Sequence, residues 1–599
     1  MERCHEMPFG AQVLNDGSVR FQLWAPSAER VELRLATGTT LPMEAAGGGW
    51  YLLETRAAAH GSRYRLCIDG EHAVPDPASR YQPDGVEAHS EVVDPRSHVW
   101  SDGAWRGRRL EEAVFYEVHP GTFDPRGDFD GVRRRLDHLH DLGVTALELM
   151  PVAEGPGRWS WGYDGVLPFA PRCRYGGPAA LKRLVEAAHE RELMVFLDVV
   201  YNHFGPQGNH LPRYAPAFLS DRHETPWGAA INFDGDDCGP VRKFFIHNAL
   251  YWLEEYHLDG LRLDAIHAII DDSATHFVDA LAQAVHSGPG QARHVHLILE
   301  NDGNEARFLH RNARGRVDRC SAQWNDDLHH VLHVLLTGET GGYYRDYADD
   351  PTRHLLRCLA QGFAWQGQPS PFRGGRRRGE PSNDLPPSAF VAFLQNHDQI
   401  GNRAAGERVG ALAPAAAVRA ATALLLLAPF PPLLFMGQEW GATQPFPYFC
   451  DYDEPLASAV REGRRREFDH SDQQSLPDPC AQQTFEQAML DWAQIDGGQA
   501  QEWLRLHREL LALRQRVLGP HLAGLRPLPG GFRRLGAGAI EATWGAGDLR
   551  LWLVANLSGE AIADVVPRPG HCWYATEAVP SGQVRMTLPP WSVYGYRSP

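Results

Sequence analysis

The chain changes its pattern of apolar and polar residues twice, and each change predicts a domain boundary. From Gly17 to about Ile68, short segments alternate apolar and polar residues and are separated by turn-forming clusters such as AGGGW. This period of two is typical of strands that bury one face. We therefore predict an N-terminal antiparallel β-sandwich over residues 1–105.

The central part of the chain combines short, continuous apolar runs with amphipathic stretches of helical period. Most of these runs are nearly free of polar residues, as parallel strands buried on both faces should be. Between residues 114 and 436 the candidate strands are VFYEV, TALELM, MVFLDVV, GLRLDA, HLILE, AQWNDD, FVAFLQ and PLLFM. Eight strand–helix units predict an α/β fold centred on a (β/α)8 TIM barrel with loop insertions, over residues 106–515.

The alternating pattern returns beyond about Gln515, in segments such as GAIEATWGA and LRLWLVANLS. It predicts a small C-terminal antiparallel β domain over residues 516–599. Within the barrel region, the segment PFRGGRRRGEPSNDLPP at 371–387 is rich in Arg, Gly and Pro. That composition predicts a solvated surface loop.

Composition excludes several classes of partner. The 599 residues carry 58 Lys plus Arg against 75 Asp plus Glu, so a net charge of -17 argues against a nucleic-acid partner. The most apolar stretch, residues 420–436, is interrupted by three prolines and predicts a buried helix leading into a strand, with no membrane association. The nine cysteines have no CxxC spacing and the N-terminal residues have no apolar signal segment, so we expect a cytoplasmic protein without a disulfide framework.

Charged side chains follow the predicted barrel strands at the ends where barrel enzymes carry their chemistry. Arg262 and Asp264 end the fourth strand and, being two apart, project from the same face. Glu300 ends the fifth strand, and His397 and Asp398 follow the seventh. Clustered buried anions are costly, so this arrangement favours a function over a structural role. Glycoside hydrolysis uses one carboxylate to attack and a second to donate a proton.

These motifs resemble the α-amylase family of retaining α-glucan enzymes. The resemblance rests on DVVYNH, GLRLDAIH, the strand-ending Glu300 and NHD, in that order, and covers nearly the whole chain. It implies Asp264 as nucleophile, Glu300 as proton donor and Asp398 as transition-state stabiliser. It further implies substrate-binding roles for Tyr163, Asp164, His203, Arg262 and His397. Arg262 would keep Asp264 ionised, because a nearby cation favours the carboxylate.

Other phrases, including VFYEVHPGTF and AQWNDDLHHVLHVLLTGETGGYY, resemble one branch of that family. This resemblance implies hydrolysis of the α-1,4 bond next to the terminal trehalose of maltooligosyltrehalose, with trehalose as product. It also implies that the N-terminal sandwich over residues 1–105 is similar to the carbohydrate-binding modules of branching and debranching enzymes. A pathway shared with a synthase that makes this substrate is implied as well. Trehalose is bent and non-reducing, so polar groups must shape the leaving-group side of the cleft. We expect further substrate-binding positions at Leu263, Ala265, Ile266, His267, Asn325, Asp326, Asp327, Leu328, His329, Gln399, Ile400, Gly401 and Asn402.

Two alternatives share this fold. A branching or debranching enzyme that acts on α-1,6 linkages would use the same three carboxylates. A catalytically inactive glucan-binding scaffold is disfavoured, because all three carboxylates and Arg262 are present. The chain has no P-loop, no GxGxxG after a strand and no HExxH motif, so we expect neither a cofactor nor a metal.

Overall fold

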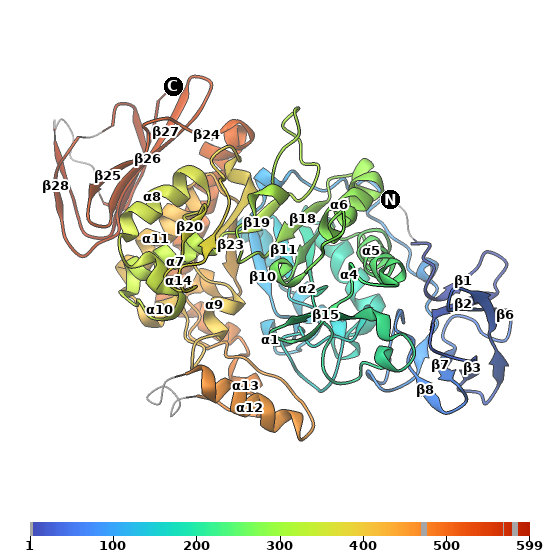
Figure 1. The fold of residues 1–599 in the computed structure, drawn as a ribbon. Helices are drawn as coiled ribbons and strands as arrows, with labels where there is room; N and C mark the ends of the chain where they lie inside the picture. The colour runs from blue at the N-terminus through green and yellow to red at the C-terminus, as the bar shows by residue number, and fades with distance from the viewer. Residues whose placement is uncertain (1–3, 469–475, 567, 578–584, 599) are drawn as a thin grey trace.

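A computed structural model describes residues 4–468, 476–566, 568–577 and 585–598, and Figure 1 shows a central barrel with one β domain on each side. The blue N-terminal domain and the red C-terminal domain lie at opposite sides of the barrel. The predicted α/β fold class, with a barrel flanked by two β domains, is confirmed.

The N-terminal domain is a sandwich of two antiparallel sheets. In one sheet the strand order is β1-β2-β6-β5, and in the other it is β4-β3-β7-β8 with β9 beside β7. Buried and half-buried residues alternate along the central strands, which is the pattern that the sequence showed. The strands are β1 (Gly10–Val13), β2 (Val19–Trp24), β3 (Val31–Leu35), β4 (Thr40–Pro42), β5 (Glu44–Gly47), β6 (Trp50–Thr55), β7 (Arg63–Ile68), β8 (His72–Val74) and β9 (Ser90–Glu91).

A buried ion pair fixes this sandwich to the barrel. Arg80 Nε lies 3.1 Å from Glu255 Oε1, and the two side chains are only 2% and 1% exposed. The same guanidinium donates to the carbonyl oxygen of Ala11 at 2.6 Å, so its remaining donors are also used. Apolar residues of the sandwich and the barrel belong to one continuous buried cluster. Together these contacts hold the two domains in a fixed arrangement.

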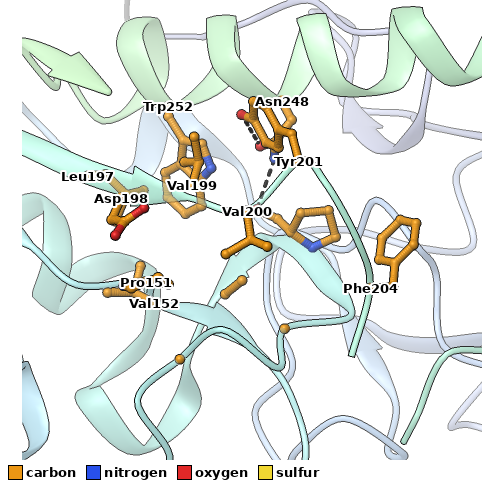
Figure 2. Close-up of a pocket in the computed structure, with 14 residues that line it drawn as sticks. Pro151, Val152, Leu197, Asp198, Val199, Val200, Tyr201, Phe204, Asn248 and Trp252 are labelled. Carbon is orange, nitrogen blue, oxygen red and sulfur yellow. Dashed lines mark hydrogen bonds between the residues drawn. The ribbon is translucent and has the colours of Figure 1, made fainter. Parts of the chain in front are cut away.

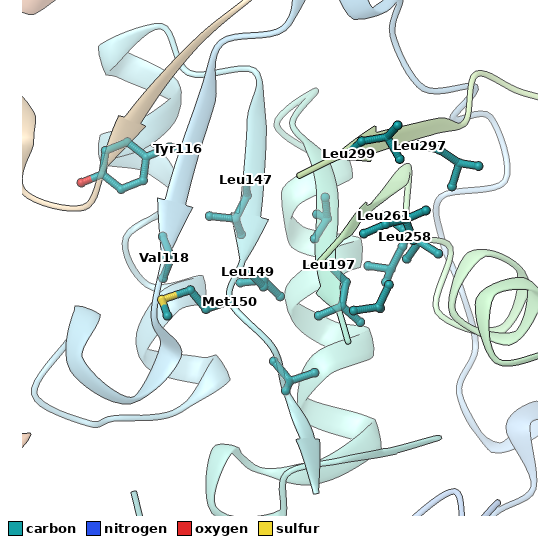
Figure 3. Close-up of a cluster of buried hydrophobic side chains, with 14 of the residues drawn as sticks. Tyr116, Val118, Leu147, Leu149, Met150, Leu197, Leu258, Leu261, Leu297 and Leu299 are labelled. Carbon is teal, nitrogen blue, oxygen red and sulfur yellow. The ribbon is translucent and has the colours of Figure 1, made fainter. Parts of the chain in front are cut away.

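Eight parallel strands form the closed barrel, in the order in which the sequence predicts them. They are β10 (Phe115–Val118), β11 (Ala146–Leu149), β14 (Met194–Val199), β17 (Gly260–Leu263), β18 (His296–Leu299), β19 (Ala322–Trp324), β22 (Phe390–Phe393) and β23 (Pro432–Phe435). Figure 3 shows leucines of neighbouring strands, including Leu147, Leu197 and Leu297, packed in one cluster. This packing explains why most of the strands read as unbroken apolar runs.

Most helices cover the outside of the barrel, and a few lie in the loops beyond the ends of its strands. The longer ones are α3 (Leu136–Leu142), α4 (Gly177–His189), α5 (Cys238–Glu255), α6 (Phe277–Ser287), α7 (Asp326–Thr337), α8 (Pro351–Gln361), α11 (Ala415–Leu427), α12 (Leu456–Glu467) and α14 (Gly498–Leu513). The shorter ones are α1 (Pro120–Phe123), α2 (Phe129–Arg133), α9 (His397–Gly401), α10 (Val409–Leu412) and α13 (Gln482–Gln487). α11 leads into β23, as the proline-interrupted apolar stretch predicts, and none of the described helices is long and apolar enough to cross a bilayer.

The C-terminal domain is built on an antiparallel sheet of order β24-β26-β27-β31-β29, with β25 beside β26 and a separate β28–β30 pair. Its strands are β24 (Arg526–Pro527), β25 (Arg533–Gly536), β26 (Ala539–Ala546), β27 (Leu549–Asn556), β28 (Ile562–Val565), β29 (His571–Ala575), β30 (Met586–Leu588) and β31 (Ser592–Arg597). Inserted hairpins in the barrel loops are β12 (Ala153–Glu154) with β13 (Leu167–Pro171), β15 (Leu219–Thr225) with β16 (Gly228–Ile231), and β20 (Gln368–Pro369) with β21 (Arg377–Arg378).

The Arg-rich segment 371–387 is only partly the solvated loop that its composition predicts. Arg376 and Arg377 are exposed, but Arg378 is 5% exposed, so the prediction is wrong at this position. Arg378 NH1 lies 2.7 Å from Asp327 Oδ1, and both side chains are buried. The ion pair with this carboxylate of helix α7 therefore explains why one arginine of the run is buried.

Candidate active site

One arginine lies between three carboxylates at the ends of neighbouring barrel strands. Arg262 is fully buried in β17, and its NH1 donates to Asp264 Oδ1 at 2.7 Å and to Asp198 Oδ2 at 2.8 Å. Its NH2 lies 3.1 Å from Glu300 Oε2. The guanidinium also lies over the Trp324 ring, 4.3 Å from the ring centre. Its position is therefore fixed on several sides, and the carboxylates gather around it.

Asp264 is fixed from two directions. Besides Arg262, the side-chain amide of Asn202 donates to Asp264 Oδ2 at 2.8 Å. The next residue, Ala265, has a left-handed backbone with φ of 40°, which is strained for a residue with a Cβ. In that conformation the Ala265 N–H donates to Glu300 Oε2 at 2.8 Å, so the strained turn links two of the carboxylates.

Glu300 is the carboxyl group best suited to hold a proton. Burial, together with the charges of Asp264 and Asp398, raises the pKa of Glu300 well above its ordinary value, although Arg262 acts in the opposite direction. The same two effects recur at Asp198, where burial first and then Asp264 raise the pKa to about 7. These surroundings favour the protonated form of Glu300 at neutral pH, which is the form that a proton donor needs.

His397 and Asp398 stand at the start of α9, after the seventh barrel strand. Tyr163 connects them to the arginine cluster, because its Oη lies 2.9 Å from His397 Nε2 and donates to Asp198 Oδ2 at 2.6 Å. The Tyr163 and His397 rings are stacked, with centres 5.2 Å apart. Two residues that are 234 positions apart in the chain thus form one wall of the site.

A cavity of about 420 Å³ opens over this cluster, which is within the usual range for a ligand site. Its lining includes the predicted residues Tyr163, Asp164, His203, Asp264, Ala265, Glu300, His397, Asp398 and Asn402. Trp161 and Tyr448 add aromatic surface. Burial, partly offset by a hydrogen bond from Tyr452, raises the pKa of Asp164. Aromatic faces with polar groups at their edge are what a sugar ring requires.

Sequence reasoning missed part of this wall. Trp227, at the tip of the β15–β16 hairpin, is 50% exposed and stacks on His203 with ring centres 5.5 Å apart. α12 supplies another side through Leu456, Val460 and Arg464. The aromatic-rich phrase PYFCDYD could have indicated Tyr448 and Tyr452, but the sequence gives no signal for α12.

Several predicted positions lie beside the cavity rather than on its lining. Asp326 lies near the site, because Gln399 Nε2 approaches its Oδ1 at 3.4 Å, and the pKa of Asp326 is raised to about 7 by burial and then Asp302. His267 is exposed and accepts from the Asp302 backbone N–H at 3.3 Å. The apolar or small positions Leu263, Ile266, Leu328, Ile400 and Gly401 are buried.

Three polar positions after the sixth strand bind protein groups. Asn325 caps α7 by accepting from the Leu328 N–H, and its amide donates to the Gly362 carbonyl. Asp327 pairs with Arg378. His329 bonds the Leu394 carbonyl oxygen through Nδ1 at 2.8 Å. These side chains brace the α7 region, and their contact with substrate stays a prediction.

The strand that carries Asp198 also has a second, much smaller cavity behind it (Figure 2). Leu197, Val199 and Trp252 lie along it, and Tyr201 donates to Asn248 Oδ1 at 2.7 Å. Its volume of about 20 Å³ is far below that of a sugar ring, so it is part of the packed core.

One group of side chains has the spacing of a metal site among the described residues. Ligand atoms of His223, Asp234 and Asp272 lie within 4.8 Å of one another. Arg222 NH2, however, lies 2.5 Å from Asp234 Oδ1, so a guanidinium already balances the buried carboxylate. The group lies away from the lining of the large cavity, and we assign it no role.

The closed parallel barrel and the carboxylates at its strand ends define a glycoside hydrolase of the α-amylase class. A family model described as alpha amylase, catalytic domain, matches residues 92–215. A model for carbohydrate-binding module 48, the isoamylase N-terminal domain, matches residues 8–95. A domain of unknown function matches residues 527–594.

Whole-chain relatives are more specific. A malto-oligosyltrehalose trehalohydrolase of Rhizobium sp. (strain M-11) is 41% identical, covering 96% of this chain and 97% of its own length. One of Saccharolobus solfataricus is 40% identical, covering 85% and 87%. A crystal structure of a putative alpha amylase from Salmonella typhimurium matches with a TM-score of 0.94 and 42% identity, covering 99% of this chain and 100% of that chain. The chain belongs to the malto-oligosyltrehalose trehalohydrolase family.

Proposed function

We propose that this glycoside hydrolase cleaves the α-1,4-glucosidic bond next to the terminal trehalose of maltooligosyltrehalose and releases trehalose, with retention of configuration. The names of whole-chain relatives at about 40% identity support this substrate. The observation that carries the chemistry is the single guanidinium of Arg262 within reach of both Asp264 and Glu300. It holds the proposed nucleophile Asp264 and the proposed proton donor Glu300 side by side, as a retaining mechanism needs.

In the proposed reaction, the Asp264 carboxylate attacks the anomeric carbon of the glucose on one side of the scissile bond. Glu300 gives its proton to the glycosidic oxygen, and trehalose leaves with that oxygen. Water then attacks the glycosyl ester and gives a proton to Glu300, which restores both groups and frees the maltooligosaccharide. Asp398 stabilises the positive charge that develops on the sugar ring.

We place the trehalose unit on the side of the site formed by the loops after strands β17, β18 and β19. Phe372 is 48% exposed there and packs edge-on against Tyr343, with ring centres 6.2 Å apart. Arg373 forms an ion pair with Asp302, and His267 lies against the same residue. An exposed ring with polar groups beside it suits a compact, bent disaccharide, which offers an apolar face to the ring and hydroxyl groups to its neighbours.

The substrate assignment is tested by product analysis. Incubation with maltotriosyltrehalose should give free trehalose and maltotriose, and a branched glucan should change little under the same conditions. If branch points are cut or formed faster than trehalose appears, the branching or debranching alternative is correct.

We propose that a synthase supplies this substrate in the cytoplasm, since trehalose release consumes a chain end that another enzyme must make.

Replacing Glu300 by glutamine tests the proton donor. E300Q should lose roughly 10²- to 10⁴-fold of the rate on maltotriosyltrehalose, the usual contribution of a general acid. On α-maltosyl fluoride the loss should be much smaller, because fluoride leaves without a proton. The ratio of the two losses, measured at one pH, is the readout. Equal losses on both substrates would contradict the role of Glu300.

A further inference from the structure

Two buried glutamates lie side by side inside the barrel and have opposite surroundings. Glu117 in β10 and Glu148 in β11 are register partners, and each is 1% exposed. Glu117 accepts two hydrogen bonds from His397, from Nδ1 to Oε1 at 2.5 Å and from the backbone N–H to Oε2 at 3.1 Å. In the described part of the chain, neither carboxyl oxygen of Glu148 has a hydrogen-bond partner. Only Glu117 is therefore placed to hold a negative charge.

A continuous series of hydrogen bonds leads from Glu117 to Asp264. His397 Nε2 bonds Tyr163 Oη, Tyr163 donates to Asp198 Oδ2, and Arg262 NH1 bonds both Asp198 and Asp264. Because the single Tyr163 proton is given to Asp198, its oxygen accepts from His397 Nε2–H. With Nδ1 donating to Glu117, both ring nitrogens of His397 carry protons, which makes the ring a cation.

The groups that face His397 favour this charge overall. They are Glu117 on β10, Glu148 on β11, Tyr163 and His119 on loops, Asp198 on β14, Arg262 on β17 and Asp398 on α9. Burial alone would lower the pKa of His397, but Asp398 and Glu117 outweigh burial and raise the pKa to about 9. At Glu148, burial and then the charge of Glu117 raise the pKa well above its ordinary value, so this neighbour stays protonated.

We propose that Glu117 is a positioning residue of the active site: it keeps His397 doubly protonated, so that the imidazolium holds Tyr163 and Asp398 in place for the sugar. Glu117 acts through His397, whose Nε2 lies 3.4 Å from Asp398 Oδ1. Loss of the Glu117 charge leaves Asp398 beside the buried ring, with Asp198 beyond Tyr163. The ring then loses one of its two N–H protons at a lower pH. A neutral ring can no longer donate both to residue 117 and to Tyr163.

The two glutamates make a matched pair for the test. Binding of maltopentaose is measured by calorimetry from pH 5.5 to 9.5 in the E300Q enzyme, where Glu300 no longer titrates. E300Q gives the reference curve, and its affinity should weaken above about pH 8 as His397 deprotonates. Asp198 and Asp326, whose pKa values are about 7, titrate in every variant, so the difference from the reference curve reports on His397. With E117Q added, weakening should begin about 1 to 3 pH units lower, so that affinity at pH 8 falls roughly 10- to 100-fold. With E148Q added, the curve should match that of E300Q alone.

Three outcomes would overturn the proposal: an E117Q curve lowered by the same factor at every pH, an E148Q curve shifted as far as that of E117Q, or no shift in either. E117D, which keeps the charge, should restore the pH midpoint even if affinity stays lower, and it also serves if E117Q fails to fold. This proposal depends on the proposed function in one respect, namely that the ligand is a glucan. A wild-type enzyme that releases no trehalose but shows these binding curves would refute that function alone.

Discussion

Asp264→Asn is expected to lower kcat on maltotriosyltrehalose by about four orders of magnitude, because an amide cannot form the glycosyl ester through which the reaction proceeds. Asparagine has the same shape as aspartate. Its single side-chain oxygen can accept from either Arg262 or Asn202, which bind different oxygens of Asp264. Substrate affinity should therefore change little. A loss in kcat without a matching loss in affinity would mark Asp264 as acting on the reacting carbon.

A matched control uses Asp141, which is exposed on α3 and far along the chain from the site. Asp141→Asn should keep wild-type kcat and affinity. For both variants, thermal unfolding first shows that the protein is folded. The rate of trehalose release and the affinity for substrate are then measured separately. A D264N enzyme within about tenfold of the wild-type rate would refute the nucleophile assignment, since residual catalysis without a nucleophile is far lower.

Arg262→Leu is expected to cost about 3–5 kcal/mol of stability, because it leaves buried carboxylates without their cation. Leucine fills much of the same volume, so the loss reflects charge more than a cavity. Arg56, whose ion pair with Asp16 is on the surface with the Arg56 side chain 71% exposed, provides the control. Arg56→Leu should leave thermal stability nearly unchanged, as exposed ion pairs contribute little.

The deficit of R262L should depend on pH in a defined direction. Burial raises the pKa of Asp198 to about 7, above its unfolded value, so the native state binds more protons than the unfolded state between about pH 4 and 7. Stability contributed by this group therefore falls as pH rises through that window. Without Arg262 the native pKa rises further and the loss continues to higher pH. Thermal inactivation should show a larger deficit at pH 8 than at pH 5, and an equal deficit at both would contradict the account.

The barrel was predictable because burial on both faces leaves a direct mark on the sequence. Runs such as MVFLDVV and HLILE are mostly apolar, and the structure places them in β14 and β18, where every residue is buried. The pairing of Arg262 with Asp264 was predictable from their spacing, since alternate residues of a strand share a face. Local rules were sufficient at these positions.

Other features depend on contacts between distant segments and leave no local mark. Glu117 is one polar residue in an apolar strand, and its partner His397 is 280 positions away. Arg378 lies in an Arg-rich run whose composition predicts solvated surface. Its burial depends on the ion pair with Asp327 on α7, which the local sequence does not indicate. Asn325 looks like an active-site amide but also meets the requirement for a helix cap, and a sequence cannot distinguish these roles.

The most direct test of the account follows the first turnovers of the wild-type enzyme on maltotriosyltrehalose by proton NMR. A retaining hydrolase of the proposed specificity should release trehalose and maltotriose in equal amounts, with the new reducing end of maltotriose appearing first as the α-anomer and only later equilibrating. A β-anomer at first appearance would contradict the retaining mechanism, and maltose or glucose in place of trehalose would contradict the proposed bond.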